Sequence, residues 1–390
     1  MSENRAVFTK YNDKYVLMHI SGNKAEHIFV YDDLSCMPVG TVINCRIENR
    51  LDNIDASFVS YAPKMSGFIN RTVKCETVIP LQYKKEPYNG KKAQFTDKIT
   101  IEGNYTVVTE GCEFVKVSAK IDPGKKYQII GRFEPLSKKY GFGIIIRTKT
   151  DTEDGGYDKA EEELINIRSL LDGIKDKSEH TKQHTILYSP LPGFIHDMIY
   201  LADQGVEETV TDDAGIYDAL SAGYESVSGP VNVTDRVSLR FYDDKMLSLC
   251  NLYSFNAKIS EALARKVYLK SGAYITIDPT EAFTAIDVNS AGSAGGHDKE
   301  ETFLDVNIEA ACEIARQIRM RNISGMIIID FISMKDDEKY DVLIKHLNDE
   351  LKKDPVNTRF IDLTGLKLAE VVRNRTGRTL RQLLGADNGR

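Results

Sequence analysis

Two short hydrophobic runs in the last third of the chain each contain one aspartate. The runs cover residues 283–288 and 326–332, and the aspartates are Asp287 and Asp330. Each run has the length and composition of a strand, in which a hydrophobic side chain would be expected at these positions. A carboxylate placed inside such a run loses hydration worth several kcal/mol unless another group compensates for it. The pattern therefore indicates that both aspartates have a specific task.

The segment between the two runs predicts that they are neighbouring strands. Apolar residues recur at helical spacing from 307 to 321, and a Ser-Gly pair then predicts the end of this helix. A strand, a helix and a second strand form a crossover unit, which places both strands in one sheet. We therefore expect Asp287 and Asp330 to meet at one end of the sheet, with Asn289 beside the first as a hydrogen-bond donor.

The residue pattern alone leaves two interpretations of the aspartates. A divalent cation bound between them would remove their repulsion, and ligation by oxygen atoms suits Mg²⁺ or Mn²⁺. An aspartate at the end of a strand can equally form a turn or cap the next helix.

The rest of the chain predicts several smaller units. Residues 1–37 and the segment after Gly40 have the pattern of short strands joined by turns, whereas residues 190–244 alternate between helix and strand. His19 and His27 lie in strand-like runs, and we predict that they are structural histidines. The pattern is that of a protein with several subdomains of the α+β and α/β classes.

Composition limits the function classes. The 390 residues are enough for about two to four compact units, and a net charge of −7 argues against a protein that coats nucleic acid nonspecifically. Local basic and aromatic sites for RNA remain compatible with this charge. No apolar run approaches the roughly 18 residues of a membrane helix, and residues 1–15 lack an apolar signal core. We expect a cytoplasmic protein with no membrane partner.

Cysteine spacing predicts neither a disulfide framework nor a zinc site. No two of the six cysteines form a CxxC pair. We therefore expect the cysteines to be reduced and to lie in the protein core. They are Cys36, Cys45, Cys75, Cys112, Cys250 and Cys312.

The segments FTAIDVNS and NIEAACEIARQIRMRNISGMIIIDFISM resemble the catalytic core of the ribonuclease E/G family of endoribonucleases. In that family the two aspartates of these motifs hold a catalytic Mg²⁺. The resemblance therefore implies that Asp287 and Asp330 are catalytic metal ligands and that Asn289 supports the first of them. Their separation of 43 residues fits the family's intervening helix without a gap.

The resemblance extends from about residue 6 to residue 384 and implies a division into four units. A ribonuclease H-like structural unit would comprise residues 1–37 and 192–258. An S1-like barrel of the oligonucleotide-binding type would cover 38–100, a unit that senses the RNA 5′ end 101–191, and a DNase I-like α/β catalytic unit 259–390.

The resemblance also implies two sets of RNA contacts. RNA-binding residues of the barrel would be Phe58, Phe68 and Lys91; the 5′-phosphate site would comprise Gly103, Val107, Arg147, Thr148 and Arg359. A guanidinium beside a hydroxyl is a suitable cradle for a terminal phosphate. Two simpler interpretations remain open, in which both phenylalanines fill the barrel core and Arg147 is an ordinary surface residue.

Basic residues near the predicted catalytic strands also have two interpretations. Arg265, Lys266 and Lys270 could steer a phosphodiester to the metal or pair with nearby acids. The C-terminal arginines resemble the closing segment of the family, where contacts to the RNA backbone are expected. They are Arg373, Arg375, Arg378 and Arg381.

The implied function is that of a metal-dependent endoribonuclease that cleaves single-stranded RNA to 5′-phosphate and 3′-hydroxyl ends in RNA processing and decay, stimulated by a 5′-monophosphate. Many family members carry a CPxC zinc motif after the catalytic region, but no cysteine follows Cys312 here. We therefore expect no zinc and no zinc-linked assembly, and homo-oligomerisation stays open. Two alternatives are a non-catalytic S1-type RNA-binding protein and a phosphoesterase that acts on DNA or small phosphoesters.

Overall fold

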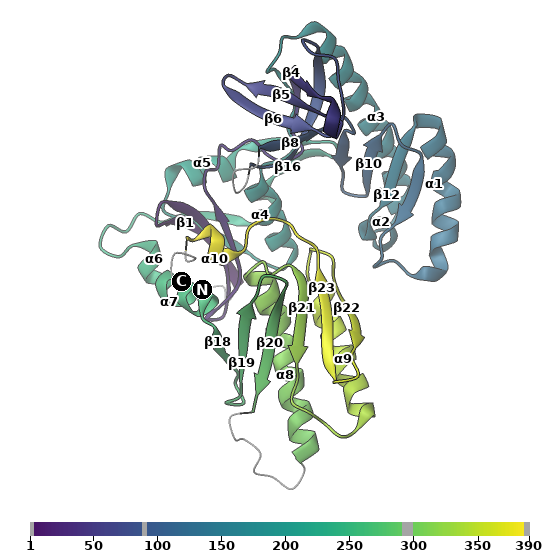
Figure 1. The fold of residues 1–390 in the computed structure, drawn as a ribbon. Coiled ribbons are helices and arrows are strands. Elements are labelled where there is room, and N and C mark those ends of the chain that lie inside the picture. The colour runs from purple at the N-terminus through teal and green to yellow at the C-terminus, as the bar shows by residue number, and fades with distance from the viewer. Residues whose placement is uncertain (1–3, 88–91, 291–298, 386–390) are drawn as a thin grey trace. The chain divides into compact units, whose positions relative to one another are not determined.

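The computed structural model describes residues 4–87, 92–290 and 299–385 and divides into two compact units (Figure 1). Unit 1 comprises residues 1–34, 197–221 and 234–390, and unit 2 comprises residues 35–196 and 222–233. Helix α4 (Gly193–Asp203) runs across the boundary between them. The boundaries of the four implied units stay predictions, and each compact unit is described by itself.

The first sheet of unit 1 has five strands in the order β17-β14-β1-β2-β3. The antiparallel N-terminal strands confirm the predicted meander, and β1 also pairs with β14 in parallel. The strands are β1 (Asn4–Tyr11), β2 (Lys14–Ser21), β3 (Lys24–Tyr31), β14 (Glu208–Thr211) and β17 (Ser238–Phe241), and the helices of this region are α5 (Ala214–Ser221), α6 (Leu249–Leu252) and α7 (Phe255–Leu263).

The two histidines of this sheet are structural, as predicted. His19 and His27 are buried and stacked with their ring planes 9° apart, and their Nδ1 atoms lie 3.1 Å apart. His27 Nε2 lies 3.0 Å from the hydroxyl of Tyr200. Burial lowers the pKa of His19 to about 4 and that of His27 to about 3. Both imidazoles are therefore neutral near pH 7.

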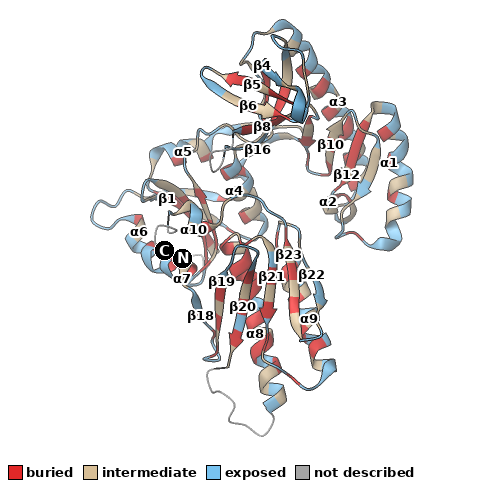
Figure 2. Cartoon of the chain, in the orientation of Figure 1, coloured by how far each residue is buried: buried red, intermediate tan, exposed pale blue. Residues whose placement is uncertain are grey.

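The second sheet of unit 1 has six strands in the order β18-β19-β20-β21-β23-β22. Helices α8 and α9 cover one of its faces (Figure 1). Buried positions alternate with half-buried or exposed ones along β19 and β20, as Figure 2 shows, because only the helix side is packed. The elements are β18 (Lys266–Tyr268), β19 (Tyr274–Pro279), β20 (Phe283–Asn289), α8 (Lys299–Met320), β21 (Gly325–Asp330), α9 (Asp337–Leu351), β22 (Thr358–Leu363), β23 (Leu368–Arg373) and α10 (Leu380–Leu383).

The predicted crossover is confirmed, with two changes of boundary. Strands β20 and β21 are adjacent and parallel, and α8 connects them. The helix begins at Lys299, eight residues before the predicted start. The second strand ends at Asp330 rather than at residue 332, so this aspartate is the last residue of its strand.

Unit 2 contains a closed five-stranded barrel of the oligonucleotide-binding type, which agrees with the predicted S1-like unit. The barrel closes because β4 pairs with both β5 and β7. The edge strand β13 adds to β4 from outside the barrel. The strands are β4 (Val42–Leu51), β5 (Ala56–Ala62), β6 (Met65–Ile69), β7 (Val78–Lys85), β8 (Ala93–Thr96) and β13 (Ile186–Tyr188), with the short helix η1 (Asp52–Ile54) between β4 and β5.

The second part of unit 2 is a four-stranded sheet in the order β11-β12-β10-β9, with helices packed on it and a two-stranded hairpin, β15–β16. Its elements are β9 (Thr100–Glu102), β10 (Thr106–Glu110), β11 (Phe114–Val117), η2 (Pro123–Lys125), α1 (Lys126–Tyr140), β12 (Phe142–Ile146), α2 (Thr148–Thr152), α3 (Gly156–His180), β15 (Gly223–Ser226) and β16 (Gly229–Asn232). The helix η3 (Val233–Asp235) follows the hairpin.

The structure corrects the prediction for the cysteines. Only Cys45 is buried, whereas Cys36, Cys75 and Cys312 are exposed, so most of them are not core residues. All six lie in the described part of the chain and none forms a disulfide. Across residues 4–87, 92–290 and 299–385, no helix has the length and apolar character needed to cross a membrane.

The C-terminal arginines have partners within the protein. Arg373 is 4% exposed, and its guanidinium donates to the carboxylate of Asp354. Arg378 pairs with Asp32, and Arg381 donates to the carbonyl oxygen of Leu263. These three arginines therefore help to hold unit 1 together, and the expectation that the segment contacts the RNA backbone stays a prediction.

Candidate active site and RNA-binding surfaces

Strand pairing places the two aspartates side by side. Asp287 on β20 is in register with Asp330 on β21, at the carboxyl ends of two adjacent parallel strands about 4.8 Å apart. Asn289 lies two residues after Asp287, and its side-chain amide donates to Asp287 Oδ2 over 2.6 Å. The meeting of the aspartates and the donor role of Asn289 are confirmed as geometry. Their catalytic roles stay predictions.

The aspartates are more exposed than the hydrophobic runs suggested. Both carboxylates lie on the face of the sheet opposite α8 and α9, and both residues are exposed. The neighbouring residues Ile286 and Ile329 point to the helix side and are buried. The expected cost of burying two charges is therefore smaller than the sequence implied.

The electrostatics of the pair favour a bound cation. Partial burial raises the pKa of Asp330, and the nearby Asp287 carboxylate raises it further. Among the described residues neither carboxylate forms an ion pair with a lysine or arginine, and no group of three histidine, cysteine or acidic side chains offers a metal site. Two carboxylates on an open face suit Mg²⁺, which is usually held by one or two carboxylates and keeps several waters.

Mg²⁺ should therefore stabilise unit 1. A ligand that binds only the folded state at 100 times its dissociation constant adds about 2.7 kcal/mol. We expect the Tm to rise with Mg²⁺ concentration in wild type and to stay flat in Asp287→Asn, measured by circular dichroism. Without metal, Asp287→Asn should be at least as stable as wild type because the repulsion is gone. An equal Mg²⁺-dependent rise in both proteins would contradict the site.

Comparison with known proteins identifies the family. A sequence model described as the Ribonuclease E/G family matches residues 100–376, which include both aspartates. The chain belongs to the ribonuclease E/G family. Among curated proteins it is similar to Ribonuclease E of Nostoc sp., with 31% identity over 372 residues that cover 89% of this chain and 52% of the relative.

Two further curated relatives support the assignment of this chain to the ribonuclease E/G family. Ribonuclease E of Synechocystis sp. is 30% identical over 371 residues, covering 89% of this chain and 54% of the relative. Ribonuclease G of Escherichia coli is 26% identical over 391 residues, covering 94% of this chain and 78% of the relative. The chain thus spans about half the length of the two ribonuclease E proteins and a larger share of ribonuclease G.

The barrel presents an aromatic pair on its surface. Phe58 on β5 and Phe68 on β6 are directly opposite each other and are half-buried, whereas their neighbours Val59 and Ile69 are in the barrel core. The interpretation that the two phenylalanines fill this core is therefore wrong. They form a surface on which bases could stack.

A lysine that the sequence reasoning missed lies beside this pair. Lys92 Nζ is 5.4 Å from the centre of the Phe58 ring and donates to the hydroxyl of Ser66. The lysine implied by the resemblance, Lys91, lies outside the described residues. The KK dipeptide was the available signal for a lysine at this place in the sequence.

Four of the five residues expected at the 5′-phosphate site lie in one region of unit 2. Arg147 follows β12, and its Nη1 donates to the carbonyl oxygen of Gly103 over 2.8 Å. The Thr148 hydroxyl lies 3.1 Å from that of Ser118, and Val107 is half-buried on β10. Their assignment as a 5′-phosphate site stays a prediction. The fifth, Arg359, is exposed on β22 in unit 1, so its part in the site also stays a prediction.

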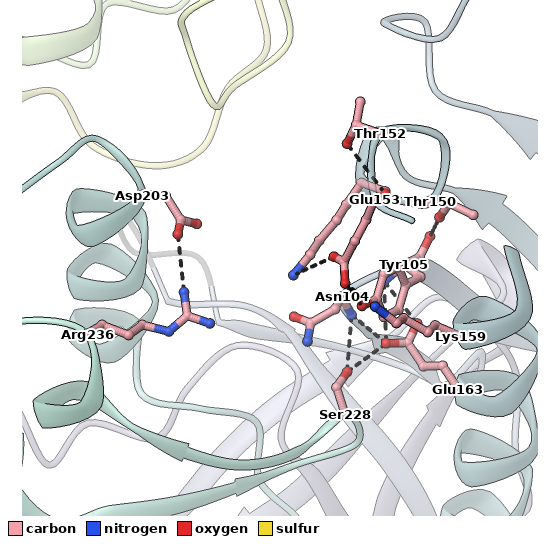
Figure 3. A network of polar contacts seen from close by, with 11 residues as sticks. Asn104, Tyr105, Thr150, Thr152, Glu153, Lys159, Glu163, Asp203, Ser228 and Arg236 are labelled. Atoms are coloured by element: carbon pink, nitrogen blue, oxygen red, sulfur yellow. Dashed lines mark hydrogen bonds and ion pairs between the residues drawn. The ribbon is translucent and has the colours of Figure 1, made fainter. Parts of the chain in front are cut away.

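A buried glutamate holds the loop that carries Gly103. Glu163 on α3 is 3% exposed, and its carboxylate accepts hydrogen bonds from the backbone of Asn104 over 2.6 Å and the hydroxyl of Ser228 over 2.6 Å (Figure 3). It also accepts from the backbone of Tyr105 and from the backbone and hydroxyl of Thr106. A Cβ at Gly103 would lie 2.2 Å from this carboxyl group. Any larger residue at position 103 would therefore clash with the buried carboxylate of Glu163, which explains the glycine.

Proposed function

We propose that this protein is a metal-dependent endoribonuclease that cleaves single-stranded RNA to 5′-phosphate and 3′-hydroxyl ends in RNA processing and decay. The observation that supports this most directly is the register of Asp287 with Asp330 in a chain of the ribonuclease E/G family. The names of the curated relatives, Ribonuclease E and Ribonuclease G, support the reaction class. The cofactor would be Mg²⁺, with Mn²⁺ as a substitute.

Asp287, Asp330 and Asn289 would have different roles in catalysis. Asp287 and Asp330 would hold the cation from two adjacent strands, so their separation is set by the sheet rather than by a loop. Asn289 fixes the orientation of Asp287 through its 2.6 Å hydrogen bond. A bound Mg²⁺ would neutralise charge on the scissile phosphate and lower the pKa of a water.

RNA would be held by the barrel of unit 2. Phe58 and Phe68 offer two rings for stacking, and Lys92 adds a positive charge next to the Phe58 ring. Each base stacked on an aromatic ring contributes about 1 to 3 kcal/mol, with little dependence on sequence. This supports a preference for unpaired RNA, whose bases are free to stack.

A 5′-monophosphate would bind near Arg147. Loss of a hydrogen bond to a charged group costs about 1.5 to 3 kcal/mol, so Arg147→Ala should reduce cleavage of 5′-monophosphorylated RNA by about 10- to 100-fold. Cleavage of the same RNA with a 5′-hydroxyl should be unchanged. The matched control is Arg168→Ala, which removes a half-buried arginine of α3 that pairs with Asp172. Equal loss on both substrates would overturn the proposed 5′-phosphate site without affecting the nuclease assignment.

The test of the nuclease assignment is cleavage of a short AU-rich single-stranded RNA with Mg²⁺ or with EDTA. We expect cleavage only with the metal, products that carry a 5′-phosphate, and no cleavage of DNA of the same sequence. Tight binding without cleavage would favour a non-catalytic S1-type RNA-binding protein. Cleavage of DNA at the same rate would favour a general phosphoesterase.

A further inference from the structure

The face of the sheet that carries the aspartates continues across β19 and β18. Asp287 is in register with Thr276 on β19, and Thr276 with Lys266 on β18. Asn289 is in the same way opposite Tyr274, which is opposite Tyr268. Because residues paired across a sheet point to the same face, both tyrosines and the lysine share the open face with the catalytic pair.

Lys266, Tyr268 and Tyr274 form a compact group, which we call the aromatic–lysine platform. Lys266 Nζ lies 3.4 Å from the centre of the Tyr274 ring and 4.7 Å from that of Tyr268. The ring centres are 6.1 Å apart and the ring planes are tilted by 55°. Tyr268 is 68% exposed, so an aromatic surface faces solvent beside the aspartates.

Lys266 provides the positive charge of the platform. The adjacent Arg265 is paired with Asp278 through two hydrogen bonds, which neutralises it. Within the described parts of the chain, Lys266 has no carboxylate partner, and its Nζ lies over the rings of Tyr268 and Tyr274. Of the two interpretations of the basic residues, pairing with an acid therefore applies to Arg265, and Lys266 keeps a charge that can meet a phosphate.

We propose that the aromatic–lysine platform is an RNA subsite that stacks one base and contacts one phosphate of a nucleotide next to the scissile bond. Lys266 lies two strands from Asp287, a distance of about 10 Å across the sheet. Tyr274 lies one strand from Asn289. This inference rests on the proposed nuclease function and extends it, because it places substrate on the catalytic sheet itself in addition to the barrel.

The competing explanation is that the three side chains only stabilise a cross-strand contact at the edge of the sheet. That role predicts lower stability for the variants and no change in RNA affinity. Binding and stability must therefore be measured on the same proteins.

The first experiment measures binding of a single-stranded RNA in EDTA by fluorescence anisotropy. We expect Tyr268→Leu/Tyr274→Leu to bind at least about 5-fold more weakly than wild type. Lys266→Gln should lower the slope of log K against log salt by about 0.7. The controls are Tyr127→Leu, which changes an exposed tyrosine of α1, and Arg265→Gln/Asp278→Asn, which removes the neighbouring pair. Affinities equal to those of the controls would overturn the platform.

The second experiment locates the base. Substrates that each lack one base are cleaved by wild type and by Tyr268→Leu/Tyr274→Leu. We expect one position near the cut at which the missing base slows wild type about 5-fold or more and the double variant not at all. Identical profiles for the two proteins would overturn the subsite. If wild type cleaves no RNA, the proposed nuclease function is wrong. If both proteins cleave RNA normally and their profiles are identical, only the proposed subsite is wrong.

Discussion

Asp287→Asn should slow RNA cleavage by about 1,000-fold, and Asp330→Asn should do the same. A metal contributes several kcal/mol of stabilisation to the transition state, and each 1.36 kcal/mol changes the rate tenfold. Each aspartate offers one of the two carboxylates of the site, and an amide is a much weaker ligand for a hard cation. Single-turnover cleavage at saturating RNA measures the chemical step separately from binding.

Two variants calibrate this loss. Asn289→Ala removes the hydrogen bond that orients Asp287 and should cost about 10- to 100-fold, because loss of such a supporting contact is smaller than loss of a ligand. Asp278→Asn removes a carboxylate from the same face of the sheet, outside the pair, and should leave the rate within about 2-fold. Full activity in Asp287→Asn would show that the metal site lies elsewhere.

The meeting of the two aspartates was predictable because each step depends on local patterns. The spacing of Ile308, Ala311 and Ala315 predicts the helix, and a helix between two hydrophobic runs predicts parallel neighbours. The two hydrophobic runs begin at Phe283 and Met326, each four residues before its aspartate, and the structure pairs these first residues, which brings Asp287 and Asp330 into register. Their exposure was not predictable, because an uninterrupted hydrophobic run does not reveal which face of the sheet is covered.

Contacts between distant segments were not predictable. Glu163 is one of three consecutive glutamates in α3, and its contacts with the loop at Asn104 and with Ser228 distinguish it from the less buried Glu161 and Glu162. The platform depends on the pairing of β18 with β19, which aligns Tyr268 with Tyr274. If β19 were shifted by one residue relative to its neighbours, Tyr274 would lie on the face of the sheet that α8 and α9 cover. These contacts depend on strand register and on burial, which cannot be read directly from a single sequence.

The second large effect concerns stability. Asp354→Ala should reduce the free energy of unfolding of unit 1 by about 3 to 5 kcal/mol, because it leaves the buried guanidinium of Arg373 without its counter-charge. Both side chains are almost fully buried, with 1% and 4% of the side chain exposed. Arg373 also donates to the side-chain oxygen of Asn322 over 2.6 Å, a neutral partner that does not replace the lost negative charge. Urea unfolding followed by circular dichroism measures the change.

The matched control is Asp349→Ala, which removes the acid of an exposed pair with Lys352 and should cost at most about 1 kcal/mol. If the arginine is structural, Asp354→Ala should bind RNA with wild-type affinity at temperatures where it is folded. An RNA contact predicts the reverse: altered affinity and a small loss of stability. Arg373→Met separates the two roles further, because it removes the buried charge itself. Combined with Asp354→Ala it should be more stable than Asp354→Ala alone, since no unpaired charge then remains in the core.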